Sequence, residues 1–153
     1  MKQIVPCLLI LLLTTSPAWS AREDRALELQ KEREKLEKES DLIDRAKIGI
    51  KISDLLLENV ADSVKAGNFD QMQEHLSAYT ATIEGAHQSL VSSGRNAGKK
   101  SEGFKDLEIA IRRQVRKFDD YARMLTTDRR EPVEQAKKLA TGIRDKLLKA
   151  LFP

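Results

Sequence analysis

Apolar side chains recur every seven residues along the first half of the chain, at Leu29, Leu36, Ile43, Ile50, Leu57 and Val64. On an α-helix this spacing forms one apolar seam that other helices can cover. The pattern therefore predicts a long N-terminal helix over residues 21–67. The shorter segments that follow are expected to be its packing partners.

The first part of this long helix is predicted to be a charged arm, residues 21–45. It is rich in helix formers and in oppositely charged pairs four residues apart, and its apolar positions are sparse. One interpretation is a coiled coil that self-associates through Leu29, Leu36 and Ile43. The alternative is a mobile, solvated extension, because the second apolar position of each heptad is mostly charged.

A helical bundle domain is predicted for residues 46–153. From Ala46 onward apolar residues lie on more than one face, which is typical of a helix inside a bundle. Gly49 indicates a bend or a close approach between helices. A break between the arm and the bundle helix is the alternative at this glycine.

A sharp turn is predicted at Gly67 and Asn68. Glycine adopts the left-handed conformation that ends a helix, and asparagine can cap the next one. The helix that follows, residues 69–92, has the most regular heptad pattern in the chain. Its inward positions are predicted to be Phe69, Met72, Leu76, Tyr79, Ile83, Ala86 and Leu90.

Two more helices are predicted after a flexible loop. Residues 92–103 are rich in Gly, Ser and Lys, a third helix starts near Phe104, and Pro132 suits the first turn of a fourth. The fold class is therefore all-α. The long N-terminal helix is expected to continue into an antiparallel bundle of about four helices, built as two αα-hairpins over 46–92 and 104–151.

Residues 1–20 have the pattern of a secretory signal peptide. Lys2 precedes an apolar stretch over 4–13, and small residues at Ala18 and Ser20 suit cleavage before Ala21. The alternative, an uncleaved membrane anchor, requires about 20 apolar residues, and this stretch is shorter. The mature protein is therefore expected to be periplasmic or extracellular, without a transmembrane segment.

Cleavage would change the available chemistry. The full chain has 27 Lys and Arg, 24 Asp and Glu, and one cysteine. Cleavage removes Lys2 and Cys7, so 26 basic and 24 acidic residues remain and no thiol is left for catalysis or metal binding. A nucleic acid partner is not expected for an exported protein.

The third predicted helix carries Lys105, Arg112, Arg116 and Arg123 on one side. This basic face predicts weak contact with an anionic envelope surface, where each charge contributes about 1 kcal/mol. In the alternative interpretation, these side chains pair with carboxylates of the same fold.

Glu84 and His87 are the one metal-ligand fragment worth testing. Ferritin-like di-iron proteins use Glu-x-x-His on bundle helices, but they need two such motifs and two more carboxylates. The sequence has only one other histidine, His75, and lacks the second motif. No metal or other cofactor is therefore predicted, and Glu84 and His87 are expected to lie at the edge of a packed seam.

No catalytic constellation is present in the sequence. It has neither a Gly-x-Ser-x-Gly elbow nor a phosphate-binding loop ending in Gly-Lys-Ser/Thr. The leading hypothesis is an exported, non-enzymatic helical protein that acts through protein–protein contacts, as a scaffold or by self-association. The alternatives are a periplasmic holdase-type chaperone and, third, a metal or ligand carrier.

Overall fold

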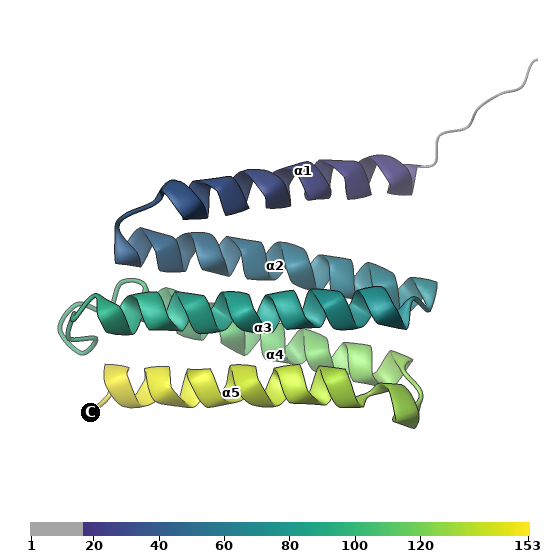
Figure 1. Ribbon diagram of the computed structural model, residues 1–153. Helices are drawn as coiled ribbons and strands as arrows, with labels where there is room; N and C mark the ends of the chain where they lie inside the picture. The colour runs from purple at the N-terminus through teal and green to yellow at the C-terminus, as the bar shows by residue number, and fades with distance from the viewer. Residues whose placement is uncertain (1–16) are drawn as a thin grey trace, which may run out of the picture.

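The computed structural model describes residues 17–153, with side chains from Ala21 onward (Figure 1). The predicted signal peptide lies mostly outside the described residues. The described part contains α1 (Pro17–Lys38), α2 (Leu42–Ala66), α3 (Phe69–Ser92), α4 (Phe104–Met124), the 3-10 helix η1 (Thr127–Arg129) and α5 (Glu131–Leu151), and no strand. The all-α prediction is confirmed, with five α-helices packed against each other.

The helices form a four-helix core with α1 on the outside. α2 packs against α3 and α4, and α5 packs against the same two helices from the other side. α1 packs mainly on α2, so it forms an outer layer at one face of the core (Figure 1).

The chain breaks its helix between α1 and α2, where the sequence pattern predicts a continuous one. α1 ends at Lys38 and α2 begins at Leu42. The Asp41 carboxylate accepts hydrogen bonds from the backbone N–H groups of Ile43 at 2.8 Å and Asp44 at 3.0 Å. This side chain caps α2, because it satisfies N–H groups that have no partner within the helix. The prediction of one helix over 21–67 is therefore wrong at residues 39–41.

Arg45 closes the turn from the other side. Its guanidinium donates to the backbone carbonyl oxygens of Leu36 and Glu39, both at 2.8 Å. These carbonyl groups belong to the end of α1, where the helix itself supplies no donors. The arginine thus fixes α1 so that it runs back along α2 instead of extending away from the bundle.

Gly49 is a point of close approach within an unbroken α2. A Cβ atom at this position would lie 3.1 Å from the Cβ of Ala86 in α3. The close approach predicted at this glycine is confirmed. The alternative, a break between the arm and the bundle helix, is correct as to the break, but the helix breaks at 39–41 and not at Gly49.

The connection between α2 and α3 follows the predicted turn chemistry. Gly67 has φ +66°, in the left-handed region, and the Asn68 side chain accepts a hydrogen bond from the N–H of Gln71 at 3.2 Å. The connection between α3 and α4 is held at Gly103, which has φ +79°. A Cβ there would meet the Leu90 side chain at 2.7 Å.

The core contains the inward positions predicted from the heptads. In α3 the buried residues are Met72, Leu76, Tyr79, Ile83, Ala86 and Leu90, while Phe69 is only partly buried. In α5 they are Val133, Ala136, Ala140, Ile143 and Leu147. The periodicity therefore identified the inward face of α3 correctly.

A buried polar network joins three helices inside this core. The Tyr79 hydroxyl donates to Oε1 of Gln114 at 2.9 Å, and Nε2 of Gln114 donates to Oγ of Ser53 at 2.8 Å. Burial raises the pKa of Tyr79, so the phenol stays protonated as a donor. Because these partners come from α3, α4 and α2, the network fixes the register of these helices.

Candidate functional site

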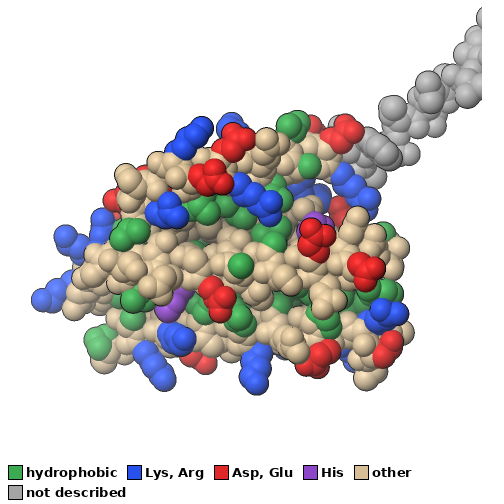
Figure 2. Space-filling view, in the orientation of Figure 1, with side chains coloured by type: hydrophobic (Ala, Val, Ile, Leu, Met, Phe, Trp, Pro, Cys, Tyr) green, Lys and Arg blue, Asp and Glu red, His purple; other side chains and the backbone are tan. Residues whose placement is uncertain are grey.

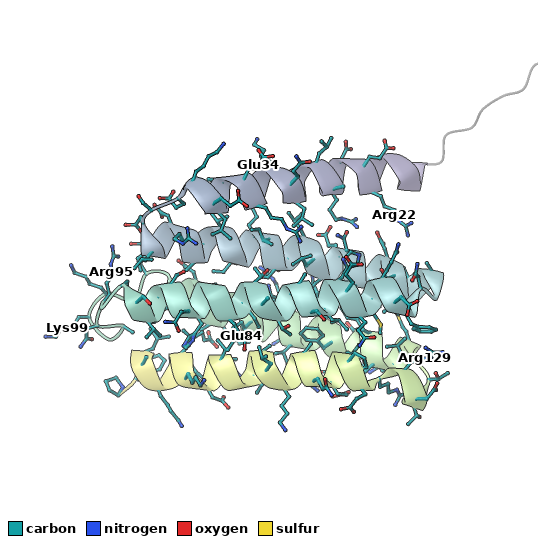
Figure 3. All side chains as sticks on the ribbon, in the orientation of Figure 1. Arg22, Glu34, Glu84, Arg95, Lys99 and Arg129 are labelled. Atoms are coloured by element: carbon teal, nitrogen blue, oxygen red, sulfur yellow. The ribbon has the colours of Figure 1, made fainter. Side chains whose placement is uncertain are left out.

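The face of α1 that contacts α2 is unusually polar. Its positions alternate three and four residues apart, at Arg22, Arg25, Leu29, Glu32 and Leu36. Three of these five are charged, whereas the buried stripe of α3 contains no charged residue. Figure 3 shows Arg22 directed toward α2 and Glu34 directed away from it. α1 therefore contacts the bundle through ion pairs as well as through apolar side chains.

Two arginines bind the C-terminal half of α2. Nε of Arg25 lies 2.9 Å from Glu58 and its Nη1 lies 2.7 Å from Asp62, while Arg22 lies 3.5 Å from Asp62. Burial acts to raise the pKa of Asp62, but the hydrogen bond and charge of Arg25 outweigh it and hold that pKa below its usual value. These partly exposed pairs are screened by salt.

Lys51 of α2 binds two carboxylates of α1. Its Nζ lies 2.7 Å from Oε1 of Glu32 and 3.1 Å from Glu28. Glu32 is only 5% exposed, and its Oε2 has no hydrogen-bond partner. The hydrogen bond from Lys51 holds the pKa of Glu32 below its usual value. A buried, half-satisfied carboxylate weakens a helix contact, because desolvation of the unpaired oxygen is not recovered.

An apolar row of α2 lies beneath α1. Ile48 and Leu55 are buried, and they precede Asp62 by fourteen and seven residues on the same side of the helix. Because Asp62 contacts α1, this row belongs to the covered side. Removal of α1 would expose it to solvent.

The three residues of the predicted self-association seam do not form one surface in this fold. Leu29 is buried and Leu36 partly buried on α1, which lies against α2. Ile43 is also buried, but it lies in the first turn of α2, next to Gly103 before α4. The seam is covered within one chain, so self-association through Leu29 and Leu36 requires α1 to leave α2.

The four basic residues predicted to meet an anionic surface lie along α4 and are all exposed. In the described part of the chain Lys105 and Arg116 form no ion pair. Arg112 lies 3.7 Å from Glu108, and Arg123 lies 3.3 Å from Asp120. The alternative of pairing within the fold therefore applies to two of the four.

The carboxylates expected to neutralise α4 are partly bound by α5 instead. Lys137 lies 2.6 Å from Asp119, and Nε of Arg144 lies 2.8 Å from Oε1 of Glu108. Figure 2 shows further Lys and Arg side chains extending from the end of the molecule where α3 connects to α4. On the face shown, this end of the bundle is therefore mainly basic.

A cleft of about 500 Å³ opens between α4, α5 and the loop that precedes α4. Both apolar and cationic side chains line it. The lining residues are Ala97, Gly98, Ser101, Lys105, Glu108, Ile109, Arg112, Arg144, Leu148, Leu151 and Phe152. Of the four basic residues predicted to meet an anionic surface, Lys105 and Arg112 thus line this cleft. Arg116 and Arg123 lie outside it.

Among the described residues, Glu84 and His87 are two possible metal ligands with no third ligand grouped beside them. Within residues 17–153, no group of three or more His, Cys, Asp or Glu side chains is arranged to hold a metal ion. Burial lowers the pKa of His87, and the charge of Lys146 on α5 lowers it further. The positive charge of Lys146 therefore disfavours any further positive charge at the His87 imidazole.

Sequence periodicity alone did not single out Glu32 and Lys51. Arg22, Arg25, Leu29, Glu32 and Leu36 follow one another at alternating intervals of three and four residues. This pattern is visible only when charged positions are counted together with apolar ones. Lys51 follows Glu32 by nineteen residues, on another helix. The pairing depends on the chain reversal at 39–41, which the heptad spacing does not reveal.

No protein family, curated protein or solved structure matches this chain. Along the helices that the structure describes, none combines the length and apolar character needed to cross a bilayer.

Proposed function

We propose that this chain is an exported, non-enzymatic helical protein that acts by self-association, and that α1 is the exchangeable element. The observation that carries this proposal is the polar stripe of α1 over the apolar row of α2. A helix held mainly by partly exposed ion pairs separates more easily than one held by a packed core. Its departure would offer Ile48 and Leu55 to the α1 of a second copy.

The heptad register supports exchange between copies. Leu29 and Leu36 continue in steps of seven into Ile43 and Ile50, although the helix breaks at 39–41. If that break straightens, α1 extends α2 as one helix and can lie on another copy. Exchange of an identical element between protomers is a low-cost route to dimers, since it reuses contacts present within one chain.

Export is the second part of the proposal and rests on the signal-peptide pattern of residues 1–20. Cleavage before Ala21 keeps Arg22, Arg25 and Glu32, the charged residues of the α1 stripe. In this proposal the antiparallel hairpins α2–α3 and α4–α5 form the stable base to which α1 docks. The mature protein would reside in the periplasm or outside the cell.

A proline at position 42 tests the exchange. Leu42 is the first residue of α2, and proline is tolerated at that position of a helix. Asp41 already has the extended backbone, ψ 123°, that a residue before proline prefers. Inside a continuous helix over 21–67, the same proline would cost about 3 kcal/mol. Leu42→Pro should therefore preserve the monomer and block the extended form.

The measurement is sedimentation velocity of the chain beginning at Ala21, over a series of concentrations. The parent chain should form a concentration-dependent dimer, and Leu42→Pro should remain monomeric. Asp41→Ala is the opposite variant, since loss of the cap destabilises the break by about 1 kcal/mol and should increase dimer. A parent that is monomeric throughout, or a proline variant that dimerises equally, would contradict the proposal.

A holdase-type chaperone is the second candidate, because the row of Ile48 and Leu55 would also hold an unfolded client. Suppression of a client protein's aggregation by a chain that stays monomeric would favour it. A metal carrier is the third and depends on Glu84 and His87. A metal retained in a native mass spectrum, and lost in His87→Gln, would favour that function.

A further inference from the structure

The cleft between α4 and α5 divides into an apolar side and a cationic side. Among the described residues, Ile109 and Phe152 are two of the five large hydrophobic side chains that are exposed, at 39% and 76%. Both line this cleft, together with Leu148 and Leu151 from α5. Apolar surface left open inside a concave site favours an apolar ligand.

The cationic side has more positive charge than its carboxylate can neutralise. Arg144 is held at 2.8 Å by Glu108, which is itself buried. Arg112 reaches the same carboxylate only at 3.7 Å, and Lys105 forms no ion pair in the described part of the chain. The lining side chains thus include three cations and one carboxylate, and only Arg112 and Arg144 pair with it. Lys105 and Arg112 remain able to donate to an anionic group.

We propose that this cleft binds an anionic single-chain amphiphile, with a carboxylate or phosphate head group. Lys105 and Arg112 bind the head group, and the chain lies on Ile109, Leu148, Leu151 and Phe152. The volume of about 500 Å³ is in the range of small-ligand pockets. The inference concerns a different face from α1 and does not depend on the proposed self-association.

Three probes separate the contributions of head and chain. Laurate has both, acetate has only the carboxylate, and lauryl maltoside has the same chain with an uncharged head. Titration calorimetry of the chain beginning at Ala21, with each probe below its micelle concentration, should detect laurate alone. Binding of lauryl maltoside as tight as that of laurate would overturn the role of the cations, and no laurate binding would overturn the proposal.

Variants locate the site. Lys105→Gln combined with Arg112→Gln should weaken laurate binding at least about tenfold, since charge-assisted hydrogen bonds are lost. Phe152→Ser should also weaken it about tenfold through lost apolar contact. Phe152 is mostly exposed, so its replacement leaves the core intact.

Arg123→Gln is the matched control. Arg123 lies on the same helix with its side chain 78% exposed, but it does not line the cleft. Its replacement should leave laurate affinity unchanged. An equal loss in this variant would indicate a diffuse basic surface and overturn the cleft site. Binding to phosphatidylglycerol vesicles without binding to monomeric laurate would overturn it in favour of a membrane surface.

Discussion

Lys51 donates a hydrogen bond to one oxygen of Glu32 at 2.7 Å, while the other oxygen of the same carboxylate is buried without a partner. This pair joins α1 to α2 at the middle of their contact. The hydrogen bond from Lys51 is strengthened by charge. The unpaired oxygen of Glu32, however, has lost its contact with water without gaining a partner. This pair therefore fixes how α1 is aligned along α2, but it does not hold the two helices together tightly.

Replacement of Glu32 by leucine should stabilise the protein by about 1 kcal/mol. The change removes a buried, half-satisfied carboxylate and adds apolar contact. Lys51 is not left without a partner, because Glu28 lies 3.1 Å away. Urea unfolding monitored by circular dichroism measures the change in the free energy of unfolding. A destabilised Glu32→Leu protein would show that the ion pair is a net stabilising element.

Acidification should weaken the fold first through its two histidines. Burial holds the pKa of His75 and His87 below the ordinary 6.5, so protonation favours the unfolded chain. The stability that the two neutral histidines contribute is fully present above pH 6.5. It is lost as the pH falls from 6.5 toward the lower pKa values that they have in the folded chain. The free energy of unfolding measured between about pH 7 and 5 should decline, and His75→Gln with His87→Gln should flatten that decline. An unchanged slope in the double variant would contradict the assignment.

Gly103 and Gly142 should respond to alanine with opposite signs. At Gly103 a Cβ would lie 2.7 Å from Leu90 in a left-handed backbone, so Gly103→Ala should destabilise by about 1–3 kcal/mol. Gly142 lies inside α5 with open space around it, so Gly142→Ala should stabilise by about 0.5–1 kcal/mol. Thermal unfolding of both variants checks the pair. Equal effects would indicate that the α3–α4 connection is not held at Gly103.

Loss of the Gln114 side chain should be among the most damaging core changes. Gln114→Leu leaves the Tyr79 hydroxyl and the Ser53 hydroxyl without their buried partner, at a cost of about 2–4 kcal/mol. Tyr79→Phe removes one member only and should cost about 1 kcal/mol. Chemical denaturation of the two variants and their double variant measures the coupling. Additive losses would show that these side chains do not act as a network.

The heptad pattern predicted the helices of the core well, because their contact faces are apolar. Met72, Leu76 and Tyr79 were expected inside and are buried. The pattern failed at residues 39–41, since the seven-residue spacing continues across the break. Asp41 is a good helix cap in the sequence and caps α2, but the contacts of Arg45 with the carbonyl groups at the end of α1 form only once the chain has turned.

The candidate sites were less predictable than the fold. Lys105 and Arg112 were recognised as basic surface residues, but the cleft also needs Leu148 from α5 and Phe152, the residue that follows this helix. Likewise, Glu32 is ordinary in a charged sequence and becomes unusual only when buried beside Lys51. Burial of charge depends on tertiary pairing, which residue spacing does not encode.

Amide hydrogen exchange of the chain beginning at Ala21 tests the central claim, that charges hold an exchangeable α1 on α2. Raising NaCl from about 0.01 M to about 1 M shortens the Debye length from about 30 Å to about 3 Å. Exchange of the α1 amides should then become at least about tenfold faster, while the α3 amides stay protected. Protection of α1 equal to that of α3, with no response to salt, would contradict the account.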